Sequence, residues 1–192
     1  MILISIGLQG QEEAQRAFSD GVRLLKSTKY VEAKKQFSIA IEKGETDQGL
    51  KMSYIYKGFS LNGLGKYDSA IICFNKAIEI DSLDPASYTD RGKTYSYKKD
   101  YANAIKDFEQ VLQLDSVGGQ AEAACYYLGR IKMLTLENEA AINYFDKLLI
   151  LAPKDAEAYF LRGTAKSNIM DSDGAIADSD KAIELKSNYM EA

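Results

Sequence analysis

The chain has 192 residues, of which 46% are hydrophobic and 27% are charged, and its formal net charge is −4. This charge balance argues against a general nucleic-acid-binding protein, because such proteins rely on clustered lysine and arginine. Histidine is absent, so the commonest general base and metal ligand are missing, and we expect neither enzyme activity nor a cofactor or metal.

The chain begins with an apolar segment, residues 1–8, which is too short to cross a bilayer and lacks the basic start of a secretory signal. We predict that residues 1–13 form an N-terminal strap or helix extension packed on the first repeat. Two alternatives are the remnant of a signal and a segment that inserts into a neighbouring molecule's groove. Cys73 and Cys125 fall on apolar helix stripes and are predicted to be buried, reduced thiols, which suits a cytoplasmic location. An exported or periplasmic location is the alternative if the N-terminus is a signal remnant.

From residue 14 onward, columns of small and aromatic residues repeat in step. The first column consists of Gly21, Gly58, Gly92, Gly129 and Gly163, at intervals of 37, 34, 37 and 34 residues. Twelve residues later stand Ala33, Ala70, Ala104, Ala141 and Ala175. Four residues later again stand Phe37, Phe74, Phe108, Phe145 and finally Ser179. Regular spacing of this kind indicates a stack of similar structural units.

The spacing within each unit is helical. Ala104, Phe108 and Val111 follow one another at intervals of four and three residues, which places them on one face of a helix. Each unit therefore reads as helix, tight turn, helix, and the chain as an all-α protein. The glycine and alanine columns allow two helices to approach closely, and the aromatic column fills the next layer.

These units resemble the tetratricopeptide repeat. The residues that carry the resemblance are Tyr88, Gly92, Tyr95, Tyr101, Ala104, Phe108 and Val111, together with Leu128, Gly129, Ala141, Phe145 and Pro153. The resemblance implies an α-α superhelix, a solenoid of stacked antiparallel helix hairpins, over residues 14–189. The predicted repeats are 14–47, 51–84, 85–118, 122–155 and 156–189, and residues 190–192 would start a missing cap or a further repeat.

Two repeats depart from the common length. The first and third carry about three extra residues, which we expect to lengthen a second helix or to loosen a turn. Glycines at 44, 49, 118 and 119 favour the looser turn. In the fifth repeat, Ser172 and Ser179 stand where the earlier repeats mostly have aromatic residues.

Two pairs of opposite charges recur at the same spacing. Arg91 and Asp107 are sixteen residues apart, as are Arg162 and Asp178. In the fourth repeat both matching positions are uncharged, so the two charges of a pair appear or disappear together. We interpret them as structural ion pairs across each hairpin rather than as catalytic groups.

The resemblance implies that the first helix of each repeat lines a concave groove that holds a protein or peptide partner. The candidate groove residues are Phe18, Val22, Lys26, Ile55, Phe59, Asn62, Lys93, Tyr97, Tyr126, Arg130, Phe160 and Thr164, with Gln15, Met52 and Glu157 beside them. Aromatic residues and three cations among them favour a peptide with apolar anchors and negative charge. The alternatives are a groove filled by neighbouring side chains or by residues 1–10, a self-assembly or spacer module that forms a homodimer, and an auxiliary domain of a larger signalling or enzymatic chain.

Overall fold

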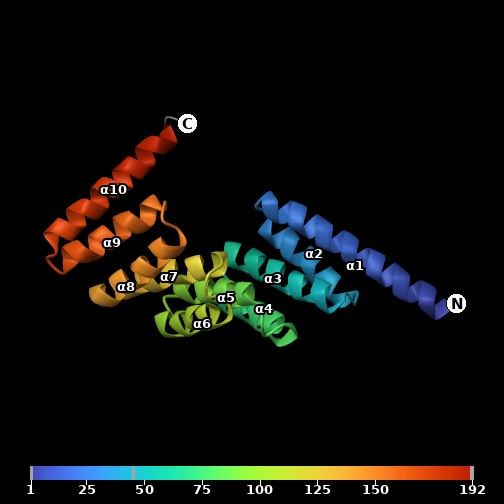
Figure 1. The fold of residues 1–192 in the computed structure, drawn as a ribbon. Helices are drawn as coiled ribbons and strands as arrows, with labels where there is room; N and C mark the ends of the chain where they lie inside the picture. Colours follow the sequence, from blue (N-terminus) through green and yellow to red (C-terminus); the bar gives the residue numbers. More distant parts are fainter. Residues whose placement is uncertain (1, 45, 191–192) are drawn as a thin grey trace. The chain divides into compact units, whose positions relative to one another are not determined.

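A computed structural model describes the backbone of residues 2–44 and 46–190, and within these ranges the side chains of residues 9–186. Every regular element that it describes is an α-helix, so the predicted all-α class is confirmed (Figure 1). The helices are α1 (Ile2–Lys26), α2 (Tyr30–Glu42), α3 (Asp47–Gly63), α4 (Tyr67–Ile80), α5 (Pro85–Tyr97), α6 (Tyr101–Leu114), α7 (Gly119–Leu134), α8 (Asn138–Leu151), α9 (Ala156–Asn168) and α10 (Ser172–Met190).

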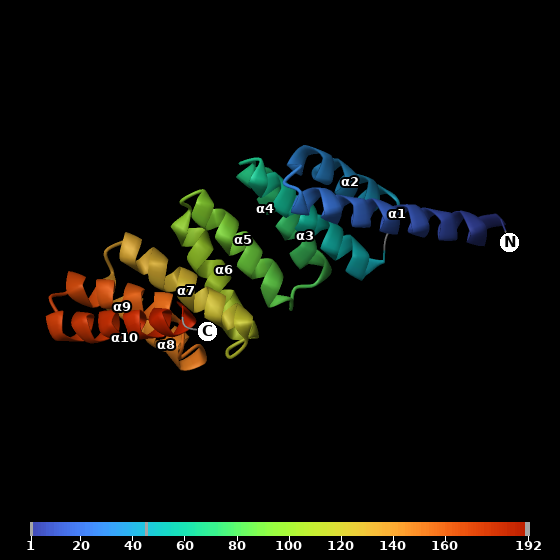
Figure 2. The same ribbon diagram turned by 90° about the horizontal axis from the view of Figure 1, so that it is seen from above.

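The chain divides into two compact units, with the boundary between α5 and α6. In unit 1 (residues 1–100), α1 packs on α2 and α3 on α4, and α5 packs on α4 (Figures 1 and 2). In unit 2 (residues 101–192), α6 packs on α7, α7 on α8 and α9 on α10. We call the pairs α1–α2, α3–α4, α7–α8 and α9–α10 hairpins 1, 2, 4 and 5.

In three hairpins a phenylalanine ring lies directly on the column glycine. The pairs are Gly21 with Phe37, Gly58 with Phe74, and Gly129 with Phe145. A Cβ atom added to any of these glycines would lie 2.6–2.7 Å from a ring carbon, closer than real Cβ atoms approach. The three rings are fully buried. The close helix approach that the glycine column predicts is therefore present, and the ring layer is built on it.

In two repeats, the first helix begins at an aspartate that caps its N-terminus. The Asp84 carboxylate accepts a hydrogen bond of 3.3 Å from the Ala86 amide, and Pro85 occupies the first turn, where its missing N–H costs nothing. The Asp155 carboxylate accepts hydrogen bonds of 2.9 and 3.1 Å from the amides of Glu157 and Ala158. These caps fix the starts of α5 and α9.

The extra residues of the first and third repeats lengthen the helix that follows them. Helices α3 and α7 have 17 and 16 residues, whereas α5 and α9 have 13 each. The expectation of a longer second helix or a looser turn is therefore wrong. The Thr46 hydroxyl accepts a hydrogen bond of 3.3 Å from the Gly49 amide, which starts α3 about one turn earlier.

The first helix already begins at Ile2, so residues 2–13 continue it. Midway along α1, Glu13 forms an ion pair of 2.6 Å with Lys43, just after α2. The side chains before residue 9 lie outside the described residues, and so do residues 191–192 of the predicted C-terminal segment 190–192. Among the described residues, no helix combines the length and apolar character that crossing a bilayer requires.

Candidate binding surface

A pocket opens between the first helices of hairpins 1 and 2, α1 and α3, which lie side by side in unit 1 (Figure 2). Its volume is about 410 Å³, and Phe18, Met52 and Tyr56 form its apolar part. None of the described residues that line it is charged. The polar and small lining residues are Gln11, Gln15, Thr46, Gln48 and Gly49. The pocket can therefore receive an apolar side chain and form hydrogen bonds at its edge.

The aromatic wall of this pocket is anchored in the hairpin cores. The Phe18 ring lies 5.4 Å from Tyr56 and 5.7 Å from the buried Phe37, measured between ring centroids. Tyr56 in turn lies 5.6 Å from Phe59, and Phe59 lies 5.8 Å from the buried Phe74. Edge-to-face and tilted contacts at these distances are favourable. The wall is thus held in place before any ligand arrives.

The predicted groove residues of hairpins 1 and 2 differ in their accessibility. Phe18, Val22 and Phe59 are half-buried, and Lys26 is exposed. Ile55 is only 6% exposed because it packs in the core of hairpin 2, so it does not belong to the groove surface and its assignment there is corrected. The next residue, Tyr56, lines the pocket instead, and the sequence analysis did not assign it to the groove.

On α5 and beside it, the predicted residues interact mostly with their own unit. The Asn62 side chain donates a hydrogen bond of 2.8 Å to the Thr94 hydroxyl. The Lys93 ammonium lies 3.8 Å from the Asp90 carboxylate. Tyr97 is 54% exposed and presents the most open surface of this group.

In unit 2, the predicted residues of α7 and α9 form a hydrogen-bonded chain. The Tyr126 hydroxyl donates to the Glu157 carboxylate at 2.6 Å and accepts from Arg130 at 3.2 Å. Burial, and next the bond to Glu157, raises the pKa of the Tyr126 hydroxyl. Phe160 is 56% exposed beside this chain, and Thr164 donates to the Phe160 carbonyl at 2.9 Å. The Tyr126 hydroxyl therefore links the side chains of Arg130 and Glu157.

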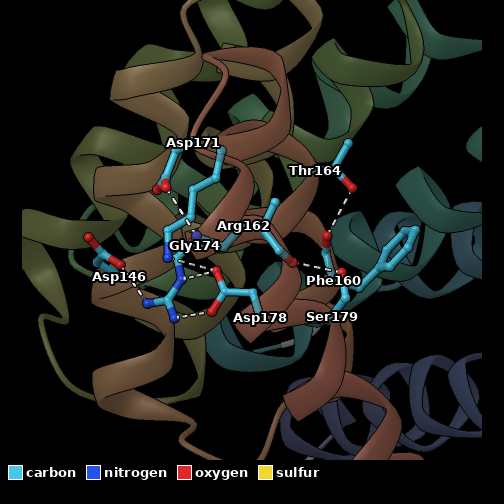
Figure 3. Close-up of polar contacts among 10 residues, drawn as sticks. Asp146, Phe160, Arg162, Thr164, Asp171, Gly174, Asp178 and Ser179 are labelled. Carbon is cyan, nitrogen blue, oxygen red and sulfur yellow. Dashed lines mark hydrogen bonds and ion pairs between the residues drawn. The ribbon is translucent and has the colours of Figure 1, made fainter.

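The structure places Arg162 and Asp178 in contact across hairpin 5, as the sequence predicts (Figure 3). The guanidinium donates two hydrogen bonds, of 2.8 and 2.5 Å, to the Asp178 carboxylate, and a third of 2.7 Å to Asp146 on α8. Lys166 lies 3.0 Å from the same Asp178 carboxylate, which is only 4% exposed. Although burial alone would raise it, these hydrogen bonds hold the pKa of Asp178 below its ordinary value.

The other predicted pair, Arg91 and Asp107, falls on the two sides of the unit boundary and stays a prediction. Within unit 1, Arg91 donates a hydrogen bond of 2.6 Å to the Asn75 side chain on α4. Sequence reasoning missed both Asn75 and Asp146. The signal was available, because each stands sixteen residues before its arginine.

Asp90 on α5 has a half-buried carboxylate, 18% exposed. Partial burial raises its pKa to about 6, against the opposing effect of Lys93 and with a further increase from Asp84. Its ordinary pKa is 3.8, so the folded protein binds this proton more tightly than the unfolded chain. Stability should then fall as the pH rises from 4 to 6. Asp90→Asn cannot ionise, and we expect it to stabilise the protein at pH 8 by at most about 3 kcal/mol, with no gain at pH 4. Urea unfolding at both pH values measures the difference.

The matched control is Glu12→Gln, which also removes a carboxylate from unit 1, but from an exposed position on α1. It should change the free energy of unfolding by less than about 0.5 kcal/mol at either pH. If Asp90→Asn showed the same small difference at pH 4 and pH 8, burial of the carboxylate would not be the cause.

The chemistry that these surfaces offer is contact and hydrogen bonding. In the described part of the chain, no three cysteine, aspartate or glutamate side chains gather closely enough to hold a metal ion. Cys73 and Cys125 are free and buried, as predicted. Burial raises the pKa of both thiols, which disfavours the reactive thiolate.

Comparison with known families identifies the repeated unit. The sequence profile of the tetratricopeptide repeat matches residues 53–82, 85–117 and 156–189, about half of the chain. The chain belongs to the tetratricopeptide repeat family. The matched segments include most of hairpin 2, helices α5 and α6, and hairpin 5, so the count of five repeats still depends on the residue columns. The family is one of protein-interaction scaffolds that are generally non-catalytic.

Two sequence relatives of this tetratricopeptide repeat protein are much longer than the chain. DnaJ homolog subfamily C member 3 of Gallus gallus is 26% identical over 209 residues, which cover 100% of the chain and 41% of that protein. TPR repeat-containing protein MJ1428 of Methanocaldococcus jannaschii is 33% identical over 103 residues, which cover 53% of the chain and 18% of that protein. The chain thus spans less than half the length of these relatives.

Solved structures show the same fold. MamA from Desulfovibrio magneticus RS-1, from residue 41 to its end, has a TM-score of 0.80 and 19% identity, covering 92% of this chain and 96% of MamA. YrrB, described as a TPR protein with an unusual peptide-binding site, has a TM-score of 0.70 and 17% identity, covering 93% of this chain and 89% of YrrB. The predicted α-α superhelix class is confirmed by these likenesses.

Proposed function

We propose that this repeat protein binds a peptide segment of a partner protein in the pocket between α1 and α3. The observation that carries the proposal is the combination of an apolar wall, Phe18, Met52 and Tyr56, with an uncharged polar edge in one pocket of about 410 Å³. Pockets of this size and chemistry commonly bind ligands through apolar burial and a few hydrogen bonds. An apolar side chain of the partner, such as leucine, methionine or phenylalanine, would enter between these three residues.

The polar edge suits a peptide backbone. Gln11, Gln15 and Gln48 are exposed, and their side-chain amides form no hydrogen bond with another described residue. Each amide offers both donors and an acceptor, which an extended peptide can satisfy with its own C=O and N–H groups. An uncharged edge favours a neutral apolar segment over the negatively charged peptide that the sequence suggests. In unit 2 the Tyr126 hydroxyl links Arg130 to the carboxylate of Glu157, which favours the same revision.

The proposal is tested by selecting peptides from a random phage-displayed library against the wild-type protein. We expect the selected peptides to share an apolar anchor residue. Met52→Glu places a carboxylate against the apolar wall, where burying an unpaired charge is unfavourable, and should weaken these peptides at least about tenfold. Fluorescence polarisation with labelled synthetic peptides measures the change.

Lys35→Glu is the matched control, because it introduces the same carboxylate in unit 1 at an exposed position of α2. It should leave the affinity within about twofold of the wild type. Circular dichroism checks that both variants keep their helix content. Peptides that bind the Met52→Glu protein as tightly as the wild type would place the binding site elsewhere.

A further inference from the structure

Hairpin 5 lacks the ring that covers the column glycine in hairpins 1, 2 and 4. The residue in the ring position is Ser179, whose hydroxyl donates to the Ala175 carbonyl at 2.8 Å and so turns back onto its own helix. A Cβ atom added to Gly163 would meet no ring, unlike in the other three hairpins; it would lie 3.1 Å from the Asp178 Cβ, 3.2 Å from the Ala175 carbonyl oxygen and 3.6 Å from the Ser179 hydroxyl. A hollow of about 430 Å³ lies here, lined by residues of α9 and α10 that include Gly163, Thr164, Ile176 and Ser179.

The equivalent groove of hairpin 4 shows what such a groove accepts. Ala141 and Phe145 stand 34 residues before Ala175 and Ser179, and they share one buried cluster with Ala158 and Ala165 of α9. Both alanines of α9 are completely buried. At the groove that contains the large Phe145 ring, α9 therefore contributes two fully buried alanines, and its larger Tyr159 and Leu161 are only partly buried there. The groove that contains only Ser179 requires the reverse, a helix with a large side chain.

The surface around the hollow is apolar and acidic. On α10, Ile176 and Ile183 are 61% and 64% exposed, although both are apolar. Asp180 lies between them on the same helical stripe and forms no ion pair or hydrogen bond with another described residue. Figure 3 shows Phe160, Thr164 and Ser179 together on one side of the hairpin, away from Arg162 and Asp178. This side therefore stays accessible while the buried ion pairs occupy the other.

We propose that the α9–α10 groove binds an amphipathic helix of a partner protein, which inserts an aromatic side chain over Gly163 and places a lysine or arginine beside Asp180. The aromatic ring would take the place that Phe145 has in hairpin 4. The basic residue would form an ion pair with Asp180, and the apolar face of the helix would cover Ile176 and Ile183. This site belongs to unit 2 and is independent of the pocket proposed in unit 1.

A phage-displayed library of amphipathic helical peptides, randomised on one face and selected against the full chain, tests the inference. We expect enrichment of phenylalanine, tyrosine or tryptophan at one position and of lysine or arginine about one turn away. Ser179→Phe supplies the ring from the protein itself, as in the other hairpins, and should weaken the selected peptides at least about tenfold without loss of stability. Asp180→Lys should weaken them by a similar factor through like-charge repulsion.

Ser19→Phe is the matched control, because Ser19 is also an exposed helical serine that donates to the carbonyl four residues earlier, at 2.9 Å. It should not change the affinity, and neither should Met52→Glu, which separates this site from the proposed pocket. Selected peptides without an aromatic residue, or undiminished binding to Ser179→Phe, would overturn the proposal. Sedimentation equilibrium that shows a wild-type dimer absent in Ser179→Phe would also overturn it, since the groove would then hold a second copy.

Discussion

Phe145→Ala is expected to lower the free energy of unfolding by about 4 kcal/mol. The Phe145 side chain is fully buried, lies on Gly129, and joins the core cluster that holds hairpin 4 to α9. Its removal loses the burial of an apolar ring and leaves a cavity. The neighbouring residues are a glycine and fully buried alanines, whose side chains are too small to move into that space. Urea unfolding followed by circular dichroism measures the change.

Phe160→Ala is the control for this variant, since it removes the same ring from unit 2 at a position that is 56% exposed. It should change the free energy of unfolding by less than about 1 kcal/mol. Equal losses for the two variants would mean that the aromatic column is not the structural layer that its burial indicates.

Asp178→Asn is the second substitution with a large expected effect, a loss of about 3 kcal/mol. An asparagine of the same shape keeps some hydrogen bonds but leaves the charges of Arg162 and Lys166 close together in a buried site. Because the folded-state pKa of Asp178 is lowered, its stabilising contribution is complete above the ordinary value of 3.8 and is lost as the pH falls through the lowered value. The difference between the variant and the wild type should therefore be largest near neutral pH and shrink in acid.

Asp146→Asn removes the other carboxylate that Arg162 contacts. Its loss of stability is compared with that of Asp178→Asn. The Asp146 side chain is 47% exposed, so solvent can replace much of its interaction with the guanidinium. We expect a loss below about 1 kcal/mol. Urea unfolding at pH 7 compares the two variants, and a larger loss for Asp146→Asn would contradict the assignment of Asp178 as the buried centre of the network.

The repeated columns predicted the core correctly because packing imposes a strict requirement on them. A ring that lies 2.6 Å from the place of a missing Cβ permits only glycine, so the pairing of Gly129 with Phe145 is visible in the sequence as a fixed spacing. The Arg162–Asp178 contact was predictable for a related reason. Two buried charges must appear together or not at all.

The groove was harder to predict, because periodicity fixes the face of a helix and not how far neighbouring helices cover it. Phe18, Ile55, Tyr126 and Phe160 all stand three residues before a column glycine. In the structure Ile55 is 6% exposed and Phe160 is 56% exposed. Ile55 packs in the core of its own hairpin, whereas the equivalent Phe160 projects from hairpin 5, and no spacing rule distinguishes the two positions.

The longer start of α3 shows how a repeat protein can acquire a new contact surface. The extra residues of the first repeat add a helical turn at the start of α3. Its N-cap Thr46 and its residues Gln48 and Gly49 all line the pocket in unit 1. Because these residues are added at the tip of the helix, the glycine and aromatic columns further along keep their register. An insertion at this junction therefore changes the lining of the pocket while the interior of the repeat stays untouched, so the surface can vary separately from the core.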